Sequence, residues 1–321
     1  MASINSVSEK KGKSEIQKSL FAKLRGNERL ILLLYALPFV VFIFMFSYVP
    51  LFGWSYAFFN YRPGIPLYRT PFVGFYNFEL ILTFYRSQII NVMRNTLIFS
   101  FIGLLSTPLP MIFAIFLNEL GSTKFKRIVQ TITTLPHFIS WVIVFSLAFS
   151  LFSGTGVVNN VLIDLGIIET PTMLLGNPDA VYIFQTMLGW WKNLGWSAII
   201  YIAAIAGIDS ELYDAAAVDG AGRFAKMRFI TFPGLINTYF VLLLLTIGNL
   251  ISVGFEQYFV FSNALVASRI EVLDVFVFRV GLGNHDFSFA TAVGILRTFI
   301  SVLLLFSANA IAKKVRGESI I

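Results

Sequence analysis

The sequence predicts an all-α integral membrane protein with six transmembrane helices, and three observations support this fold class. Of the 321 residues, 57% are hydrophobic and only 13% are charged, whereas a soluble globular chain carries about 25% charged residues. The mean hydropathy is +0.77. Six stretches have the roughly 20 mostly apolar residues that a helix needs to cross a bilayer. We expect these spans at residues 30–52, 95–117, 129–152, 181–208, 235–255 and 287–312.

The first stretch, 30–52, is predicted to be a retained transmembrane helix. It is longer than the roughly 7–15 apolar residues of a signal peptide, and no small-x-small cleavage pattern follows it. The fourth and sixth stretches are each interrupted by one cation, Lys192 and Arg297. We expect the boundaries of these two spans to be the least regular.

The distribution of basic residues predicts that both termini are cytoplasmic. With six spans, the termini share a side with the second-to-third and fourth-to-fifth loops. Most of the 24 lysines and arginines lie in these four segments, seven in the N-terminal tail and three in each of the others. The opposite side has Arg62, Arg69, Arg86, Arg94, Arg269 and Arg279, spread over longer loops. By the positive-inside rule the lysine-rich side faces the cytoplasm. The net charge of +7 is therefore a topology signal, and no nucleic-acid partner is expected.

The N-terminal tail, residues 1–29, leaves two interpretations open. Ile16, Leu20, Phe21 and Leu24 lie on one helical face among basic residues, which is typical of an interfacial helix in contact with membrane lipid. A solvated basic tail that only orients the first span fits equally well. Residues 313–321 are expected to form a short cytoplasmic tail at the other end.

Several kinds of chemistry are missing from the sequence. The chain has no cysteine, which excludes disulfides, cysteine-based metal sites and thiol nucleophiles. The two histidines, His137 and His285, are far apart in sequence, so no metal site is expected. The predicted spans are poor in carboxylates, which disfavours proton or sodium coupling. No phosphate-binding G-x-x-x-x-G-K-[ST] motif is present, and we expect no cofactor in this chain.

The loop at 209–233 has the most distinctive pattern in the chain. We expect a short helix with Ser210 as N-cap, a left-handed turn at Gly220, and a second short helix that Pro233 ends. Alanines on the first helix give it a face with little side-chain bulk, which suits insertion into a groove on a partner. An ordinary connector between two spans is the alternative interpretation.

The pattern of this loop resembles the EAA motif of the permease subunits of bacterial ABC importers. That motif reads acidic-Ala-Ala, two residues, Asp-Gly-Ala and, further on, Ile-x-Leu-Pro. The matching residues here are Asp214, Ala215, Ala216, Asp219, Gly220, Ala221, Ile230 and Pro233. Two positions depart from it, because Asp214 replaces the usual Glu and Phe232 the usual Leu.

Other stretches resemble the same family. Residues 72–78 look like the G-x-x-N-F segment of sugar-importer permeases, and Asn95-Thr96-Leu97 looks like the opening of the family's core. The long outer loops and the basic tail look most like the branch that imports complex oligosaccharides, including uronate-containing fragments of plant cell walls.

The resemblance implies the type I ABC importer permease fold, a bacterial plasma-membrane location and a set of partners. The chain would be a non-catalytic subunit that pairs with a second, homologous permease, most simply as a heterodimer. An external solute-binding lipoprotein would deliver the oligosaccharide, and a separate dimeric ATPase would bind ATP and magnesium and dock on the loop at 209–233. The permease core would cover 95–312, after a first helix and outer loop at 30–94.

Candidate substrate-path residues come from the fourth, fifth and sixth spans. Lys192 and Arg297 lie in mid-span without an evident carboxylate partner, which is costly unless they line a water-filled cavity. They would attract an anionic sugar, with Trp190, Trp191, Trp196 and Tyr201 as stacking surfaces and Glu256 and Gln257 near the rim. Snorkelling from a misplaced span boundary, or pairing with the second permease, would explain both cations equally well.

Two other function classes remain open on the sequence. A secondary carrier working alone would need coupling carboxylates, and an integral membrane enzyme acting on glycans would need acids or bases facing a cavity. The carboxylate-poor spans argue against both.

Overall fold

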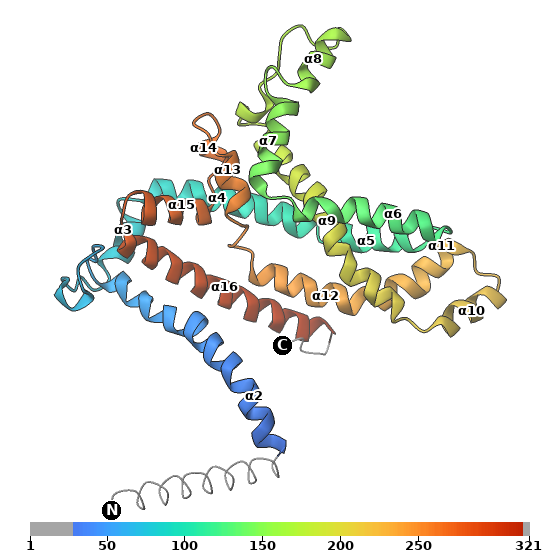
Figure 1. Ribbon diagram of the computed structural model, residues 1–321, viewed down its shortest axis with the longest axis horizontal. Helices are drawn as coiled ribbons and strands as arrows, with labels where there is room; N and C mark the ends of the chain where they lie inside the picture. Colours follow the sequence, from blue (N-terminus) through green and yellow to red (C-terminus); the bar gives the residue numbers. More distant parts are fainter. Residues whose placement is uncertain (1–27, 317–321) are drawn as a thin grey trace, which may run out of the picture. The chain divides into compact units, whose positions relative to one another are not determined.

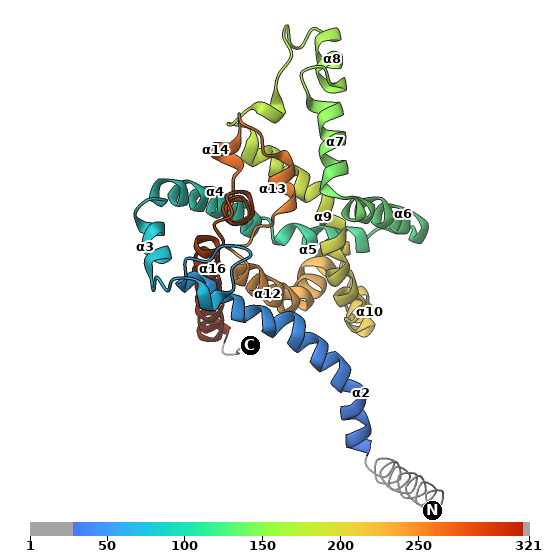
Figure 2. The same ribbon diagram turned by 60° about the vertical axis from the view of Figure 1, so that its left-hand side comes forward.

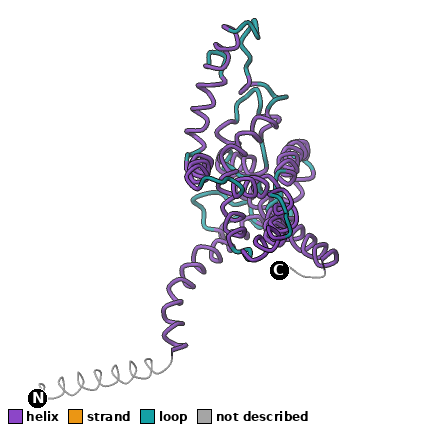
Figure 3. The backbone as a smooth tube through the Cα atoms, turned by 90° about the vertical axis from the view of Figure 1, so that its right-hand side faces the viewer, coloured by secondary structure: helices purple, strands orange, loops and turns teal. Residues whose placement is uncertain are grey.

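The computed structural model describes residues 28–316, and every regular element in this range is a helix (Figure 3). An isolated antiparallel bridge joins Phe59 and Phe72. The chain forms two compact units, of which the first ends at Tyr56 and the second begins at Ala57. The predicted all-α class is confirmed for this range, while the tail residues expected to form an interfacial helix lie outside it.

The first unit is a continuous apolar helical segment. Helix α2 (Glu28–Ile43) leads directly into a π-helical turn, η1 (Phe44–Tyr48), and a 3-10 helix, η2 (Val49–Phe58). Residues Leu32–Phe58 are long and apolar enough to cross a membrane. Their large apolar side chains are mostly exposed, as expected of a helix that faces lipid. The first predicted span is thus confirmed and extends beyond residue 52.

The second unit contains the remaining helices (Figure 1). The longer ones are α4 (Arg86–Leu105), α5 (Pro108–Asn118), α6 (Thr123–Thr134), α7 (Trp141–Phe152), α9 (Val181–Ala206), α12 (Phe232–Gly248) and α16 (Phe287–Arg316). The shorter ones are η3 (Leu67–Arg69), α3 (Tyr76–Leu82), η4 (Leu135–Phe138), α8 (Val157–Asp164), η5 (Leu174–Gly176), α10 (Ser210–Val218), α11 (Arg223–Lys226), η6 (Met227–Thr231), α13 (Glu256–Phe261), α14 (Ala267–Ile270), α15 (Leu273–Phe278) and η7 (Arg279–Gly283).

Three clusters of buried apolar side chains hold the second unit together. The first joins α5, α9 and α12 around Met111, Ala198 and Leu235. A second joins α4, α15 and α16, where Phe276 and Phe289 are fully buried. The third joins α7, α9, α13 and α15. Figures 1 and 2 show α7 and α8 extending away from these packed helices.

Five helices within the described residues are long and apolar enough to cross a membrane, and a sixth is obtained if α9 and α10 count as one broken span. These two helices are bent by 69° at the break between them. The count of six predicted spans agrees with this larger number. The sixth predicted span is confirmed, since α16 begins at Phe287, and α9 matches the fourth.

The predicted third span at 129–152 is wrong. Helix α6 ends at Thr134, the 3-10 turn η4 follows, and a new helix begins at Trp141 with the Ser140 side chain as its N-cap. Pro136 within η4 lacks the N–H that a continuing helix would need. The apolar span is instead Trp141–Asp164, formed by α7 and α8.

The predicted boundaries of the second and fifth spans are also wrong. The second apolar stretch is Arg86–Asn118, so α4 runs through the domain boundary expected at 94–95. The fifth is Arg223–Gly248, and Pro233 does not end a helix. The π-helical turn η6 widens the helix just before Pro233, where the usual backbone hydrogen bond cannot form. The chain leaves the helix after Gly248 and stays irregular up to Phe255.

Gly195 of α9 lies close to the backbone of α6, which gives a test of the packing. A Cβ atom at Gly195 would lie 2.3 Å from the carbonyl oxygen of Thr133, while one at Gly294 in α16 would meet nothing within 4 Å. Gly294→Ala should therefore stabilise the protein by about 0.5–1 kcal/mol through helix propensity. Gly195→Ala should destabilise it by about 1–3 kcal/mol through overpacking. Thermal unfolding in detergent micelles measures both, and equal shifts in Tm would contradict the close crossing.

Candidate functional site

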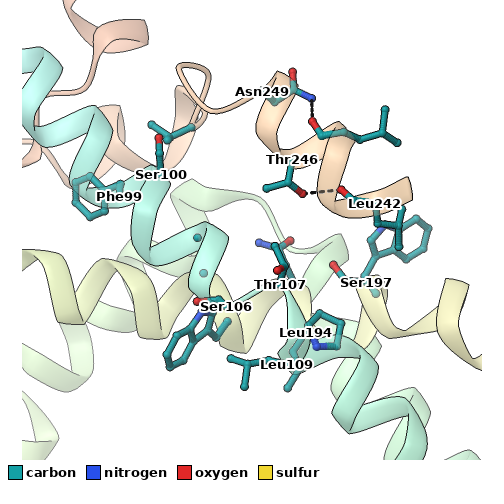
Figure 4. Close-up of a pocket in the computed structure, with 18 of the residues that line it drawn as sticks. Phe99, Ser100, Ser106, Thr107, Leu109, Leu194, Ser197, Leu242, Thr246 and Asn249 are labelled. Carbon is teal, nitrogen blue, oxygen red and sulfur yellow. Dashed lines mark hydrogen bonds between the residues drawn. The ribbon is translucent and has the colours of Figure 1, made fainter. Parts of the chain in front are cut away.

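A cavity of about 710 Å³ lies between α4, α5, α9, α12 and the irregular segment 249–253 (Figure 4). Hydroxyl and amide side chains from α4, the turn before α5, α9, α12 and the irregular segment line it, namely Ser100, Ser106, Thr107, Asn193, Ser197, Thr246, Asn249 and Ser252. No lysine, arginine, aspartate or glutamate of the described chain is among the lining residues. The wall is therefore uncharged: most of its surface is apolar, with hydroxyl and amide groups distributed over it.

The polar groups of this wall are held by short-range hydrogen bonds. Thr246 donates its hydroxyl to the carbonyl oxygen of Leu242 at 2.9 Å, and Asn249 donates its amide to that of Leu245 at 3.0 Å (Figure 4). Each side chain keeps an oxygen that can accept a further hydrogen bond. The cavity can thus bind a hydroxyl-rich molecule without offering it an opposite charge.

The predicted substrate-path residues divide into two groups. Trp190, Trp196 and Tyr201 line the cavity. Trp190 and Trp196 are 40% and 44% exposed, whereas Tyr201 is buried. The residues that do not line it are Trp191, Lys192, Arg297, Glu256 and Gln257.

Lys192 is buried and points to the break between α6 and α7. Its ammonium donates to the carbonyl oxygens of His137 at 2.6 Å and Pro136 at 3.3 Å. It also lies 5.5 Å from the ring centroid of Trp141. The last carbonyls of a helical segment have no partner within it. Lys192 thus supplies a donor to two carbonyls at this break, of which that of Pro136 also accepts the Ile139 N–H at 3.2 Å.

His137 and Asn193 make a second connection between this break and α9. The imidazole Nδ1 lies 3.0 Å from the Asn193 amide oxygen. The ring also stacks on Trp196, with ring centroids 4.5 Å apart. Since Trp196 and Asn193 both line the cavity, the break supports one side of its wall.

Arg297 does have a carboxylate partner, so the expectation of an unpaired cation is wrong. Its guanidinium lies 2.5 Å from a carboxylate oxygen of Asp274 on α15 and also donates to the Ser252 hydroxyl. Asp274 follows an irregular stretch and lies outside every predicted span, so inspection of the spans alone missed it. The sequence signal for a buried carboxylate was the aspartate at the second position of the otherwise apolar segment Leu273–Phe278.

Glu256 and Gln257 begin α13. Glu256 is exposed, and Gln257 donates to the backbone oxygen of Gln185 at 2.8 Å and to its side-chain oxygen at 2.9 Å. These bonds join α13 to α9. Within residues 28–316 no group of three or more histidine, aspartate or glutamate side chains is arranged to hold a metal ion.

Helix α10 carries the first part of the EAA-like pattern at the cytoplasmic side of the predicted topology. Asp209, not Ser210, is its N-cap, because the Asp209 carboxylate accepts the backbone N–H of Glu211 at 3.0 Å. Gly220 has a φ of +75°, the left-handed turn predicted there. The exposed pattern residues of this segment are Asp214, Ala215, Asp219 and Gly220, while Ala216 and Ala221 are half-buried.

The second part of the pattern lies on the helix that leads into α12. Ile230 is half-buried in the π-helical turn η6, and Pro233 is in the first turn of α12. The Tyr213 hydroxyl on α10 lies 2.9 Å from the hydroxyl of the fully buried Thr231. This contact, which the pattern alone did not single out, fixes α10 to the base of α12.

Comparison with known proteins places the chain in a transport family. The family described as "Binding-protein-dependent transport system inner membrane component" matches residues 106–317. Protein LplB of Bacillus subtilis (strain 168) is 36% identical over 304 residues, covering 94% of each chain. The polygalacturonan/rhamnogalacturonan transport system permease protein YteP of the same organism is 37% identical over 312 residues, covering 96% of this chain and 95% of YteP.

Solved structures give the same result for the fold. One chain of a bacterial ABC transporter involved in the import of the acidic polysaccharide alginate superposes with a TM-score of 0.81 at 31% identity. The match covers 93% of this chain and 99% of that chain. The alginate transporter solved in complex with an alginate pentasaccharide-bound periplasmic protein gives the same TM-score of 0.81.

The predicted permease fold is thus confirmed, and both alternatives, a secondary carrier and a glycan-processing membrane enzyme, lose their support. The chain belongs to the family of inner membrane components of binding-protein-dependent transport systems, and it is a multi-pass permease subunit of an ABC importer.

Proposed function

We propose that this permease imports an oligosaccharide delivered by an external solute-binding lipoprotein. The observation that carries the proposal is the similarity to YteP, whose name gives polygalacturonan and rhamnogalacturonan as cargo, over 96% of this chain. The cavity supports it, because hydroxyls, amides and two exposed indoles suit a hydroxyl-rich ligand. A carboxylate on the cargo would find no cation in this wall, so the second permease would have to supply one.

The loop at 209–233 is the proposed docking site for a separate ATPase dimer, which would bind ATP and magnesium. Leu212 and Val218 on α10 are 54% and 89% exposed, and small alanines lie between them. An exposed apolar helix with little bulk fits a groove on a partner. The contact between Tyr213 and Thr231 would carry a movement of α10 to α12.

The remaining partner is a second, homologous permease, and we propose a heterodimer in the bacterial plasma membrane. Leu97 and Phe101 on α4 are 46% and 59% exposed. They border a second hollow whose lining is almost entirely apolar. Lipid or a partner helix would cover such a face in the membrane.

The docking assignment predicts the effect of two substitutions. Gly220→Pro forces a negative φ on a residue at +75°, and Ala216→Arg adds bulk to the docking face. Both should abolish binding-protein-stimulated ATP hydrolysis by the purified complex in proteoliposomes. The variants should still insert in the membrane. Gly222→Ala is the matched control, because Gly222 has a φ of −70° and open space around it. Normal stimulation in either variant would refute the docking role.

The position of Lys192 predicts that it supports the fold and does not attract cargo. Lys192→Met leaves the His137 carbonyl without its donor and the Pro136 carbonyl with only the Ile139 N–H. A loss of about 1–3 kcal/mol in stability should follow. Uptake of an acidic and of a neutral oligosaccharide, measured at equal membrane levels, should fall by the same factor. A selective loss of acidic uptake would instead make Lys192 a cargo-binding residue.

The predicted orientation of the chain in the membrane can be tested with introduced cysteines, because the chain has none of its own. With both termini in the cytoplasm, a cysteine in place of Ser319 should react with a membrane-impermeant maleimide only after the cells are opened. A cysteine in place of Thr170, in the loop before α9, should react in intact cells. The reverse pattern would invert the topology.

A further inference from the structure

The cavity wall contains one segment without regular structure. Helix α12 ends at Gly248, α13 begins at Glu256, and residues Asn249, Leu250, Ser252 and Val253 between them line the cavity. Gly254 has a φ of +111°, a backbone conformation that favours glycine. An irregular segment has no helical hydrogen-bond ladder of its own, so its shape depends on what the surrounding side chains supply.

Arg297 and Asp274 supply most of these contacts. Arg297 on α16 pairs with one oxygen of Asp274 on α15 at 2.5 Å and donates to the Ser252 hydroxyl. The other oxygen of Asp274 accepts the backbone N–H of Gly254 at 3.3 Å. The pair thus contacts the segment at the Ser252 hydroxyl and at the Gly254 N–H, and it links the segment to α15 and α16.

The two ends of the segment are held separately. Ser100 on α4 donates its hydroxyl to the carbonyl oxygen of Leu250. The ring of Phe255 packs on Phe278 of α15, with centroids 4.7 Å apart. Between these ends, the middle of the segment is held by the contacts of Arg297 and Asp274, by the burial of Ile251 and by one backbone hydrogen bond, in which the Ser252 N–H donates to the carbonyl oxygen of Asn249 at 2.8 Å.

The charges of the pair are shielded from the cavity. The Asp274 side chain is 11% exposed and that of Arg297 is 28% exposed. Neither residue lines the cavity, whereas their partner Ser252 does. Removal of one partner of such an ion pair is strongly destabilising, because it leaves the other charge largely buried and uncompensated.

We propose that the Arg297–Asp274 ion pair is a positioning device that holds residues 249–254 in place as a wall of the transport cavity, without contacting the cargo. The inference deepens the proposed function, because it assumes that this cavity is part of the oligosaccharide path. It predicts that the wall needs both residues, because Arg297 holds the Ser252 hydroxyl and Asp274 accepts the Gly254 N–H.

The mobility of a spin label reports directly on the order of residues 249–254, and the measurement needs no cargo. The full-length chain, which has no cysteine, receives Asn249→Cys as a reporter on the segment or Ile200→Cys as a reporter on the α9 side of the cavity. Each is labelled with a nitroxide in lipid nanodiscs. Arg297→Gln and Asp274→Asn should each raise the mobility of the label at 249 and leave the label at 200 unchanged.

Two further variants make the measurement specific. Arg279→Gln is the matched control, because it breaks a neighbouring ion pair, Arg279–Glu271 at 2.6 Å, whose arginine side chain is 47% exposed. It should leave both labels unchanged. The exchange Asp274→Arg with Arg297→Asp keeps an ion pair but removes the acceptor of the Gly254 N–H, because arginine has no acceptor atom. It should therefore leave the label at 249 more mobile than in the unsubstituted chain. An unchanged label at 249 in the single variants, equal loosening at 200, or a label at 249 restored to its original mobility by the exchange would each overturn the proposal.

An uptake assay distinguishes a positioning role of the ion pair from cargo binding by Arg297. The purified transport complex in proteoliposomes is given its binding protein and a radiolabelled galacturonate trisaccharide. Asp274→Asn frees the Arg297 cation, so a cargo-binding arginine would keep or raise uptake in this variant. A positioning pair predicts a fall of roughly tenfold or more, as expected when a functional wall moves. If no variant of the complex carries the sugar, the proposed cargo is wrong, whereas the label at 249 still decides the role of the pair.

Discussion

Backbone groups inside a membrane have to find partners within the protein, and the second unit of this permease is organised around that requirement. Its helices break at 135–140 and at 249–255. At the first break the Lys192 ammonium takes up two carbonyl oxygens, and at the second Asp274 accepts a backbone N–H while Ser100 donates to a carbonyl. Both cations that interrupt the apolar spans thus contact the breaks. The second break lines the cavity, and the first supports its wall through Asn193 and Trp196.

The middle and the C-terminal end of α9 connect different parts of the molecule. Near its middle, Lys192, Asn193 and Trp196 contact the break after α6 and the cavity wall. Its last residue, Ala206, lies just before α10, which the Tyr213–Thr231 contact fixes to the base of α12. A displacement of α10 would therefore reach the cavity through two helices, α9 and α12, which pack against each other around Ala198 and Leu235.

Local patterns in the sequence predicted what is local in the structure. Apolar runs gave the number of spans and the position of α16, and the Asp-Gly pair gave the left-handed turn at Gly220. The contacts that fix the cavity could not be predicted in this way, because Arg297 and Asp274 come from separate elements and Lys192 meets carbonyls 55 and 56 residues away. The break at Pro136 was missed because the apolar content of 129–152 outweighed a single proline.

The uncharged wall has a consequence for the energetics of passage. A sugar that meets only uncharged groups, namely hydroxyls, amides, indoles and apolar side chains, gains and loses contacts of similar strength as it advances. Its free energy along this side of the path therefore changes little. A deep electrostatic well would hold an acidic cargo and slow its release, and conduction generally requires sites weak enough to leave. Selectivity in such a system can then rest with the protein that delivers the cargo, while the membrane subunit is built for throughput.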